Sequence, residues 1–155
     1  MKRRVLFVCL GNICRSPLAE AASRAEAERQ GIDVEIDSAG TGDWHVGHPP
    51  DARAAAVAKR NGVDISQLRA RQVGPDDFLL FDHIVALDAQ NLADLRAMRP
   101  AGSSAELSLL LDHVAGREGE AVADPYYGEE SGFDVTWADV TAGAAGLIAR
   151  LQGQR

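Results

Sequence analysis

The chain has 155 residues, of which 46% are apolar and 25% are charged, a balance close to the average of globular proteins. This length suits one domain with one hydrophobic core, over residues 1–155, and the composition argues against a disordered or fibrous chain. With 23 acidic residues against 16 Lys and Arg, the formal net charge is −7, which argues against nucleic acid as the general partner.

The N-terminus, MKRRVLFVCLG, joins a basic start to an apolar run, as a signal peptide does. The apolar run over residues 5–10 is too short for that role, and the polar residues Asn12 and Arg15 follow it, so we expect a first strand in a cytoplasmic protein. No stretch of the sequence approaches the roughly 20 apolar residues that span a membrane, so no membrane partner is expected. Two cysteines, Cys9 and Cys14, make no disulfide framework of a secreted fold, which fits a reducing compartment.

The first part of the chain predicts two strands separated by a helix. Residues 4–8 are largely apolar without polar alternation, as in a strand buried on both faces of a parallel sheet. A helix is predicted over about residues 16–30, with Pro17 in its first turn and Gly31 at its end. Residues 34–38 alternate in the manner of a second strand, and a Gly-rich loop follows.

The middle of the chain continues the alternation. Residues 51–60 predict a helix, and after an irregular stretch residues 82–87 predict a third strand. Asp88 is expected to cap the next helix, which Pro100 ends. Residues 105–111 are apolar enough for a fourth strand, although their leucine content also allows a helix.

A last helix is predicted over residues 133–151, and the whole pattern defines the fold class. Strands that alternate with helices imply right-handed crossovers, hence an α/β fold with three α/β/α layers and a four-stranded central parallel sheet, Rossmann-like in kind. Ligands of such sheets bind beyond the carboxyl ends of the strands. Cys9, Trp44 and Asp88 fall at or just after predicted strand ends, so we expect one rim to gather them.

The segment over residues 9–16, CLGNICRS, holds the candidate site. A buried strand ends at Cys9, Gly11 and Asn12 tolerate positive φ, and a helix starts near Arg15, so successive backbone N–H groups can turn inward around an anion. Apart from its two ends, the residues expected to surround a bound phosphoryl group are Leu10, Gly11, Asn12, Ile13 and Cys14.

The two ends of this segment suit nucleophilic phosphoryl transfer. A helix N-terminus and a guanidinium favour the thiolate form of a cysteine, so Cys9 is the candidate nucleophile, the alternative being a small buried side chain at a strand end. Arg15 offers a planar fork that holds two phosphoryl oxygens, which a lysine cannot do. Ser16 can donate to the Cys9 sulfur or cap the helix. The segment therefore predicts a phosphatase that needs no metal.

This segment closely resembles the low-molecular-weight protein tyrosine phosphatases, together with DSAGT at residues 37–41, ARQ at 70–72 and DPYY at 124–127. The resemblance covers nearly the whole chain. It implies a phosphatase I-like fold, a phosphocysteine intermediate on Cys9, phosphate binding by Arg15 and protonation of the leaving phenol by Asp124. The same carboxylate can then deprotonate the hydrolytic water. Phosphotyrosine-containing proteins are the implied substrates, inorganic phosphate the product, no cofactor is implied, and a monomer or weak dimer is expected.

The resemblance also implies how the pocket is built. Trp44 and Tyr126 are candidate aromatic walls for a flat substrate, although Trp44 could instead pack on its own loop. Asn12 and Ser38 match family positions where a hydrogen bond holds the loop in its strained shape. Many relatives carry His before the ARQ tripeptide, whereas this chain has Leu68 and Arg69, so a supporting hydrogen bond from there is in doubt.

Three other functions are weighed against this one. Thioredoxin-coupled arsenate reductases relay oxidation through downstream cysteines, and none follows Cys14 here. Protein-arginine phosphatases favour Thr where this chain has Ile13, whose bulk should exclude a phosphoguanidinium. A non-catalytic phosphate-binding or redox-sensing protein would keep the loop, with Cys9 and Cys14 able to pair reversibly. His45 and His48, three positions apart without a third ligand, do not predict a metal site.

Overall fold

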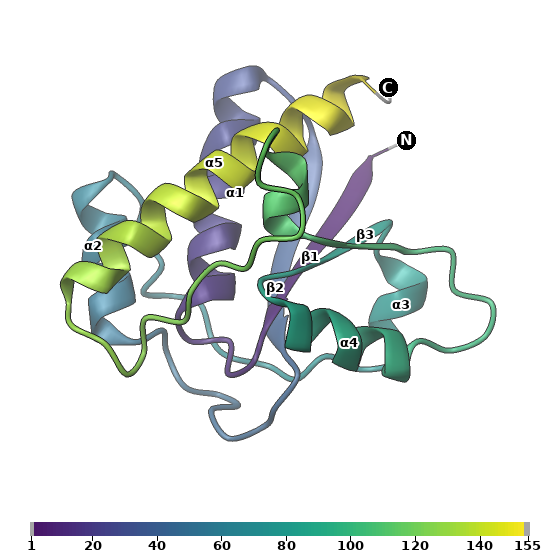
Figure 1. Ribbon diagram of the computed structural model, residues 1–155, viewed down its shortest axis with the longest axis horizontal. Helices are drawn as coiled ribbons and strands as arrows, with labels where there is room; N and C mark the ends of the chain where they lie inside the picture. The colour runs from purple at the N-terminus through teal and green to yellow at the C-terminus, as the bar shows by residue number, and fades with distance from the viewer. Residues whose placement is uncertain (1, 154–155) are drawn as a thin grey trace.

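The apolar run that follows the basic N-terminus forms the central strand of a parallel sheet. The computed structural model describes residues 2–153 and contains four strands in the order β2-β1-β3-β4 (Figure 1). Their bounds are Arg3–Cys9 for β1, Val34–Gly40 for β2, His83–Ala86 for β3 and Glu106–Leu109 for β4. β1 pairs with β2 on one side and β3 on the other, so the end of β1 lies in the middle of the sheet rim.

Helices cover both faces of this sheet (Figure 1). One face carries α1 (Arg15–Gln30), α2 (Ala52–Arg60) and α5 (Ser131–Gly153), and the other carries α3 (Asp77–Leu80) and α4 (Ala89–Met98). Side chains of β1 alternate between the two cores: Val5 and Phe7 pack in the core under α1 and α5, whereas Leu6 and Val8 pack in the core under α3 and α4. The predicted three-layer α/β/α fold is confirmed.

Two local predictions need correction. The stretch expected to be irregular contains the short helix α3, whose single turn is too brief to show a helical period in sequence. The expected strand over residues 105–111 is divided: β4 ends at Leu109, and a 3₁₀ turn, η1, spans Leu110–His113. Leu110 and Leu111 are both fully buried in the core under α5, which alternating strand side chains would not allow.

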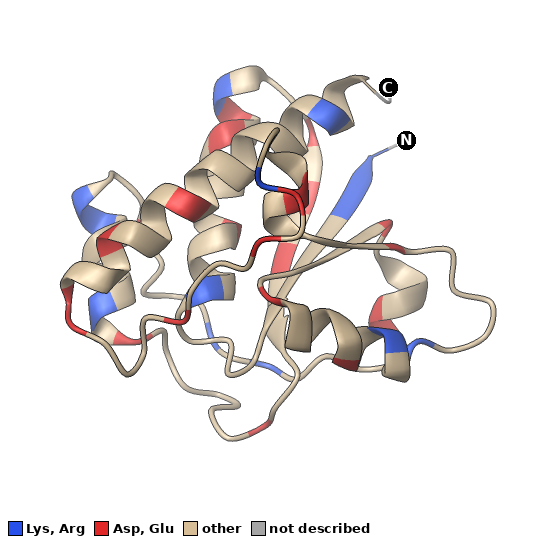
Figure 2. Cartoon of the chain, in the orientation of Figure 1, with Lys and Arg blue, Asp and Glu red and all other residues tan. Residues whose placement is uncertain are grey.

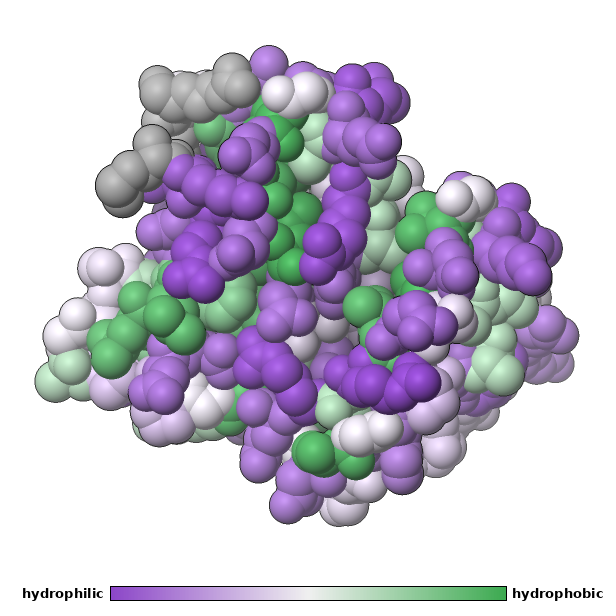
Figure 3. Space-filling view, turned by 180° about the vertical axis from the view of Figure 1, so that it is seen from behind, coloured by the Kyte–Doolittle hydropathy of each residue, from purple (hydrophilic) through white to green (hydrophobic). Residues whose placement is uncertain are grey.

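The surface carries charges of both signs. Figure 2 shows acidic and basic positions interspersed over the elements, and Figure 3 shows the reverse side as mainly hydrophilic, with hydrophobic side chains in separate patches. Among residues 2–153, no helix combines the length and apolarity that crossing a membrane requires. Since the net charge is −7, binding of an anion depends on local groups rather than on the charge of the whole molecule.

Candidate functional site

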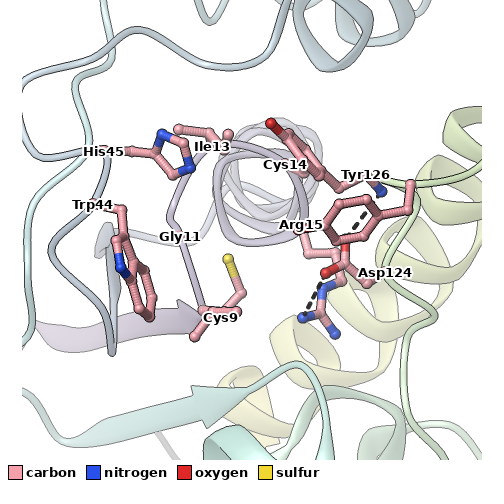
Figure 4. Close-up of a pocket in the computed structure, with 11 residues that line it drawn as sticks. Cys9, Gly11, Ile13, Cys14, Arg15, Trp44, His45, Asp124 and Tyr126 are labelled. Atoms are coloured by element: carbon pink, nitrogen blue, oxygen red, sulfur yellow. Dashed lines mark hydrogen bonds and ion pairs between the residues drawn. The ribbon is translucent and has the colours of Figure 1, made fainter.

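Cys9 is the last residue of β1, at the carboxyl edge of the sheet. It is buried, and its sulfur points into a cavity of about 320 Å³ (Figure 4). The cavity is lined by six residues of the segment 9–15 and by Trp44, His45, Asp124, Tyr126 and Tyr127. Chain segments that lie far apart in sequence therefore meet at the end of the central strand, where the α/β fold is expected to place a ligand.

The loop that follows Cys9 is held from outside the cavity by its carbonyl groups. Three backbone N–H groups donate to them at 2.8 to 2.9 Å: those of Thr41, Gly42 and Asp51, to the carbonyl oxygens of Cys9, Leu10 and Ile13 respectively. Carbonyl oxygens, which would repel an anion, are thus engaged by neighbouring segments. The loop can then present its N–H groups to the cavity instead.

Among the described residues, three N–H groups of the loop are free, whereas that of Asn12 donates to Cys9 Sγ. Within residues 2–153, no protein acceptor takes the N–H groups of Gly11, Ile13 and Cys14. Asn12 has φ of 57°, the one positive value among the described non-glycine residues, and this reversal is what curls the loop. Gly11 was expected to share that role, but its φ is not positive. A glycine is needed there for a different reason: a Cβ would lie only 3.0 Å from the His45 ring. The loop therefore has the shape of a backbone cradle, with free donors that an anion could accept from.

Two donors lie next to the Cys9 sulfur. The Ser16 hydroxyl oxygen lies 3.0 Å from Sγ, and the N–H of Asn12 donates to Sγ over 3.3 Å. The alternative that Ser16 caps α1 is wrong: Cys14 occupies the N-cap position, and no side chain makes a capping bond there. Hydrogen bonds of this kind stabilise a thiolate relative to a thiol.

Asn12 does not line the cavity but holds the loop together from behind. Its Nδ2 group donates to Ser16 Oγ at 2.8 Å and to Ser38 Oγ at 3.0 Å, which joins the loop to β2. The Asn12 Oδ1 atom accepts the backbone N–H of Arg71 at 3.0 Å. A main-chain donor thus supplies the support that Leu68 cannot give. Because the three bonds use both ends of the amide, they set its orientation.

Arg15 is 3% exposed and is aimed by two acceptors. Its Nη1 group donates to Asp88 Oδ2 at 2.8 Å and to the carbonyl oxygen of Val122 at 2.9 Å. Asp88 also accepts the N–H of Asn91 at 2.7 Å, so it does cap α4 as expected. Its contact with Arg15 was not foreseen, although its place after a strand end on the predicted rim is the signal that could have found it.

Asp124 comes to the cavity through a loop that is tied to the sheet. The N–H of Val122 donates to the carbonyl of Leu87, directly after β3, at 2.8 Å. Asp124 Oδ2 then lies 3.7 Å from Arg15 Nη2, and its Oδ1 atom accepts the N–H of Tyr126 at 3.1 Å. A partly exposed carboxylate therefore faces the cavity from the side opposite Trp44 (Figure 4).

Aromatic side chains form the walls. Trp44 is 67% exposed and lines the cavity, and its ring also packs against Gly42 of its own loop, where an added Cβ would lie 1.9 Å from it. Tyr126 lies across from it, with the Arg53 guanidinium 5.7 Å from its ring centre, and Tyr127 stands edge-on to Tyr126 at 4.8 Å. His45, considered in the sequence only as a metal ligand, also lines the cavity. The walls suit a flat apolar group carried above the anion cradle.

Cys14 differs from Cys9 in its surroundings. Both cysteines are free and buried, and both line the cavity. Burial raises the pKa of the Cys14 thiol far above its ordinary value, and the charges of Asp51, Cys9 and Asp124 add to the effect. Cys14 therefore remains a neutral thiol at ordinary pH, a poor nucleophile.

The cavity brings together two buried sulfurs, those of Cys9 and Cys14, with one guanidinium and one carboxylate. Arg15 is the single Lys or Arg that lines the cavity, and Asp124 is the single acidic residue. Both lie on the same side of the Cys9 sulfur (Figure 4). In the part of the chain that the structure describes, no three His, Cys, Asp or Glu side chains cluster as metal ligands. The arrangement can bind an oxyanion, attack it with sulfur and exchange a proton with a neighbouring atom.

Comparisons with known proteins agree with this site. Residues 4–155 match the family described as Low molecular weight phosphotyrosine protein phosphatase. A protein of that name from Schizosaccharomyces pombe is 47% identical over 133 residues, which cover 84% of this chain and 85% of that protein. The crystal structure of a protein tyrosine phosphatase from Entamoeba histolytica superposes with a TM-score of 0.93 at 34% identity, covering 99% of each chain. The structure of a Drosophila arginine phosphatase superposes with a TM-score of 0.90 at 31% identity, covering 98% of each chain.

Proposed function

Because the chain belongs to the low molecular weight phosphotyrosine protein phosphatase family, we propose that it hydrolyses phosphotyrosine in proteins through a phosphocysteine on Cys9. The observation that carries this proposal is the placement of the Cys9 sulfur at the base of the backbone cradle, with Arg15 and Asp124 on one side of the cavity. Phosphotyrosine fits the two parts of the cavity, its phosphoryl group in the cradle and its ring between Trp44 and Tyr126.

The first step transfers the phosphoryl group to sulfur. Cys9 Sγ forms a bond to phosphorus while the bond from phosphorus to the phenolic oxygen breaks. Arg15 and the free N–H groups of the loop hold the equatorial oxygens and stabilise the charge of the transition state. Asp124, as a carboxylic acid, gives its proton to the departing oxygen, so tyrosine leaves as a neutral phenol.

The second step releases inorganic phosphate. A water molecule attacks phosphorus, Asp124 takes one of its protons, and the bond from phosphorus to sulfur breaks. Cys9 leaves as a thiolate, to which the Ser16 hydroxyl and the Asn12 N–H can donate. The proton given up in the first step is thereby regained, and the enzyme returns to its starting state without a cofactor.

A protein-arginine phosphatase is the second candidate, since one of the similar structures carries that name. Its substrate would bring a branched guanidinium to the position taken by the phenolic oxygen. Ile13 lines the cavity beside His45, and its side chain narrows the space next to the cradle. This favours a flat, unbranched leaving group, and therefore phosphotyrosine.

Hydrolysis of a phosphotyrosine peptide in excess EDTA, under reducing conditions, tests the proposal. We expect wild type to release phosphate, Cys9→Ser to release none, and a phosphoarginine substrate to react much more slowly. Cys14→Ser is the matched control, because it makes the same exchange at the other cysteine of the cavity. A folded, reduced wild type that hydrolyses neither substrate would overturn the proposal in favour of phosphate binding or redox sensing.

A further inference from the structure

Glu20 is a buried carboxyl group behind the cysteine loop that the mechanism above does not use. It lies on α1 and is 1% exposed. Its Oε2 atom accepts two donors from Arg24, at 2.9 and 3.0 Å, and its Oε1 atom accepts the Ser38 hydroxyl at 2.7 Å. Burying a carboxylate costs free energy unless such partners satisfy it, so a buried one suggests a specific role.

The bond to Glu20 determines what Ser38 can do. A serine hydroxyl has one hydrogen, and a carboxylate can only accept, so Ser38 donates to Glu20. The Ser38 oxygen is then left to accept from Asn12 Nδ2, at 3.0 Å. The backbone N–H of Arg71 needs an acceptor, so the Oδ1 atom of the Asn12 amide must face Arg71. The Asn12 amide is therefore held in one orientation by two anchors.

The hydrogen bonds continue from Asn12 through Ser16 to the nucleophile. The second hydrogen of Asn12 Nδ2 goes to Ser16 Oγ at 2.8 Å, so Ser16 accepts there and its own hydrogen is free. Two acceptors lie within its reach, the Cys9 sulfur at 3.0 Å and the carbonyl of Ala39 at 3.4 Å. A thiolate at the shorter distance is the stronger acceptor, because hydrogen bonds to charged groups are the stronger ones.

We propose that Glu20 is a positioning residue whose carboxylate sets the direction of four successive hydrogen bonds, through Ser38, Asn12 and Ser16, so that the last one is donated to the Cys9 thiolate. Its effect on turnover rests on the proposed phosphatase function, but its effect on the sulfur does not. A glutamine at this position could turn its NH₂ group toward Ser38. The Ser38 hydroxyl would then point its hydrogen toward Asn12 Nδ2, which is itself a donor. This relay of four hydrogen bonds would lose its fixed direction.

Alkylation of Cys9 by iodoacetate across a pH range tests the relay, because only the thiolate reacts. Peptide mass locates the label on Cys9 rather than Cys14. For Glu20→Gln we expect the midpoint of the alkylation curve to move to higher pH, and the kcat for a phosphotyrosine peptide to fall about fivefold with a smaller change in KM. Glu26→Gln is the matched control: it removes a glutamate of the same helix that is likewise paired with an arginine, Arg29, and should leave the curve unmoved.

Two further variants separate a relay from a structural role. Ser38→Ala should move the alkylation midpoint in the same direction, and Glu20→Gln should add nothing in the Ser38→Ala background, because the connection is already broken. An unmoved curve in Ser38→Ala overturns the proposal even if Glu20→Gln fails to fold. An undiminished effect of Glu20→Gln in that background also overturns it. A wild type without phosphatase activity would refute the proposed function and leave the alkylation result valid.

Discussion

Asp88 and Arg15 are joined by an ion pair of 2.8 Å although they lie 73 positions apart, and the other oxygen of Asp88 caps α4. One carboxylate thus fixes both a helix and the guanidinium that faces the cavity. Because Arg15 is almost fully buried, this bond is largely protected from water, and hydrogen bonds to charged groups are worth more than neutral ones. Arg15 is therefore oriented before any phosphoryl group arrives.

Asp88→Asn separates the two tasks of this carboxylate. Asparagine caps a helix about as well as aspartate, so the free energy of unfolding should change little. The charge opposite Arg15 is lost, and we expect kcat/KM for a phosphotyrosine peptide to fall roughly tenfold. Asp94→Asn makes the same exchange on the same helix away from the cavity and should keep full activity. Unchanged kinetics in Asp88→Asn would show that Arg15 needs no such partner.

Arg15→Lys keeps the charge but loses the planar fork. Lysine cannot hold two phosphoryl oxygens together or reach Asp88 and Val122 in the same way. We expect kcat to fall by about a hundredfold, corresponding to roughly 3 kcal/mol of transition-state stabilisation. Arg60→Lys, on α2 in an exposed ion pair with Asp134 of α5, serves as the control. Near-normal turnover of Arg15→Lys would argue against bidentate phosphate binding.

Asp124→Ala should show its role through the leaving group. A phenolate leaves more readily if its acid is stronger, so p-nitrophenyl phosphate needs less protonation than phenyl phosphate. We expect kcat/KM to fall about a hundredfold or more for phenyl phosphate and much less for p-nitrophenyl phosphate. Glu130→Ala removes an exposed acid of the same loop and should affect neither substrate. Equal losses on both substrates would contradict a general-acid role.

Ile13→Thr tests the steric account of specificity. Threonine is smaller and would open the cavity beside the cradle, where Ile13 lies. We expect the ratio of phosphoarginine to phosphotyrosine turnover to rise about tenfold, the range in which one or two methylene groups discriminate between substrates. Ile13→Val, which stays branched and apolar, is the control. A constant ratio across these variants would mean that another part of the pocket excludes phosphoarginine.

Glu20→Gln should change stability in a pH-dependent way. Burial is the largest influence on Glu20 and raises its pKa above the ordinary value of a glutamate, while the bonds from Ser38 and Arg24 oppose that rise. Between the unfolded and the folded pKa the native state holds the extra proton, so wild-type stability falls as pH increases through that window.

The variant lacks this titration. The unfolding free energy of Glu20→Gln minus that of wild type should therefore increase from pH 4 upward and then level off above the folded pKa. Urea denaturation of both proteins across this range measures the difference. A difference that stays constant with pH would mean that the pKa of Glu20 is not raised by folding.

Much of the fold follows from local patterns in the chain. The run over β1 and the helix signals at Pro17 and Gly31 predict β1 and α1 to within a residue or two. Patterns failed where they are short or where packing overrides them, as in the single turn of α3 and in η1. At η1, Gly143 of α5 comes so close that an added Cβ would lie 2.4 Å from Leu110, so helix packing rather than sequence preference bends the chain there.

The cysteine loop and its Asn12–Ser38 support could be recognised from the sequence, whereas the contacts of its acidic supports, Glu20 and Asp88, could not. Cys9, Arg15 and Ser16 lie within eight residues, and a strand, a left-handed Asn12 and a helix start are properties of neighbouring residues. The remote acids gave no comparable signal. Asp88 was expected to cap a helix, which is one of its two tasks, and nothing in the sequence distinguishes Glu20 from Glu26 and Glu28 of the same helix.

The sequence by itself determined the chemistry: a cysteine and an arginine at the two ends of a loop whose shape depends on the residues within it. Only the tertiary structure decided which groups would act on that loop. Glu20 on α1, Ser38 on β2 and Asp88 after β3 meet around it because parallel strands bring their carboxyl ends to one edge. Hydrogen bonds have reaches of about 3 Å, so such partners are chosen by the packing of whole elements and not by any spacing along the chain.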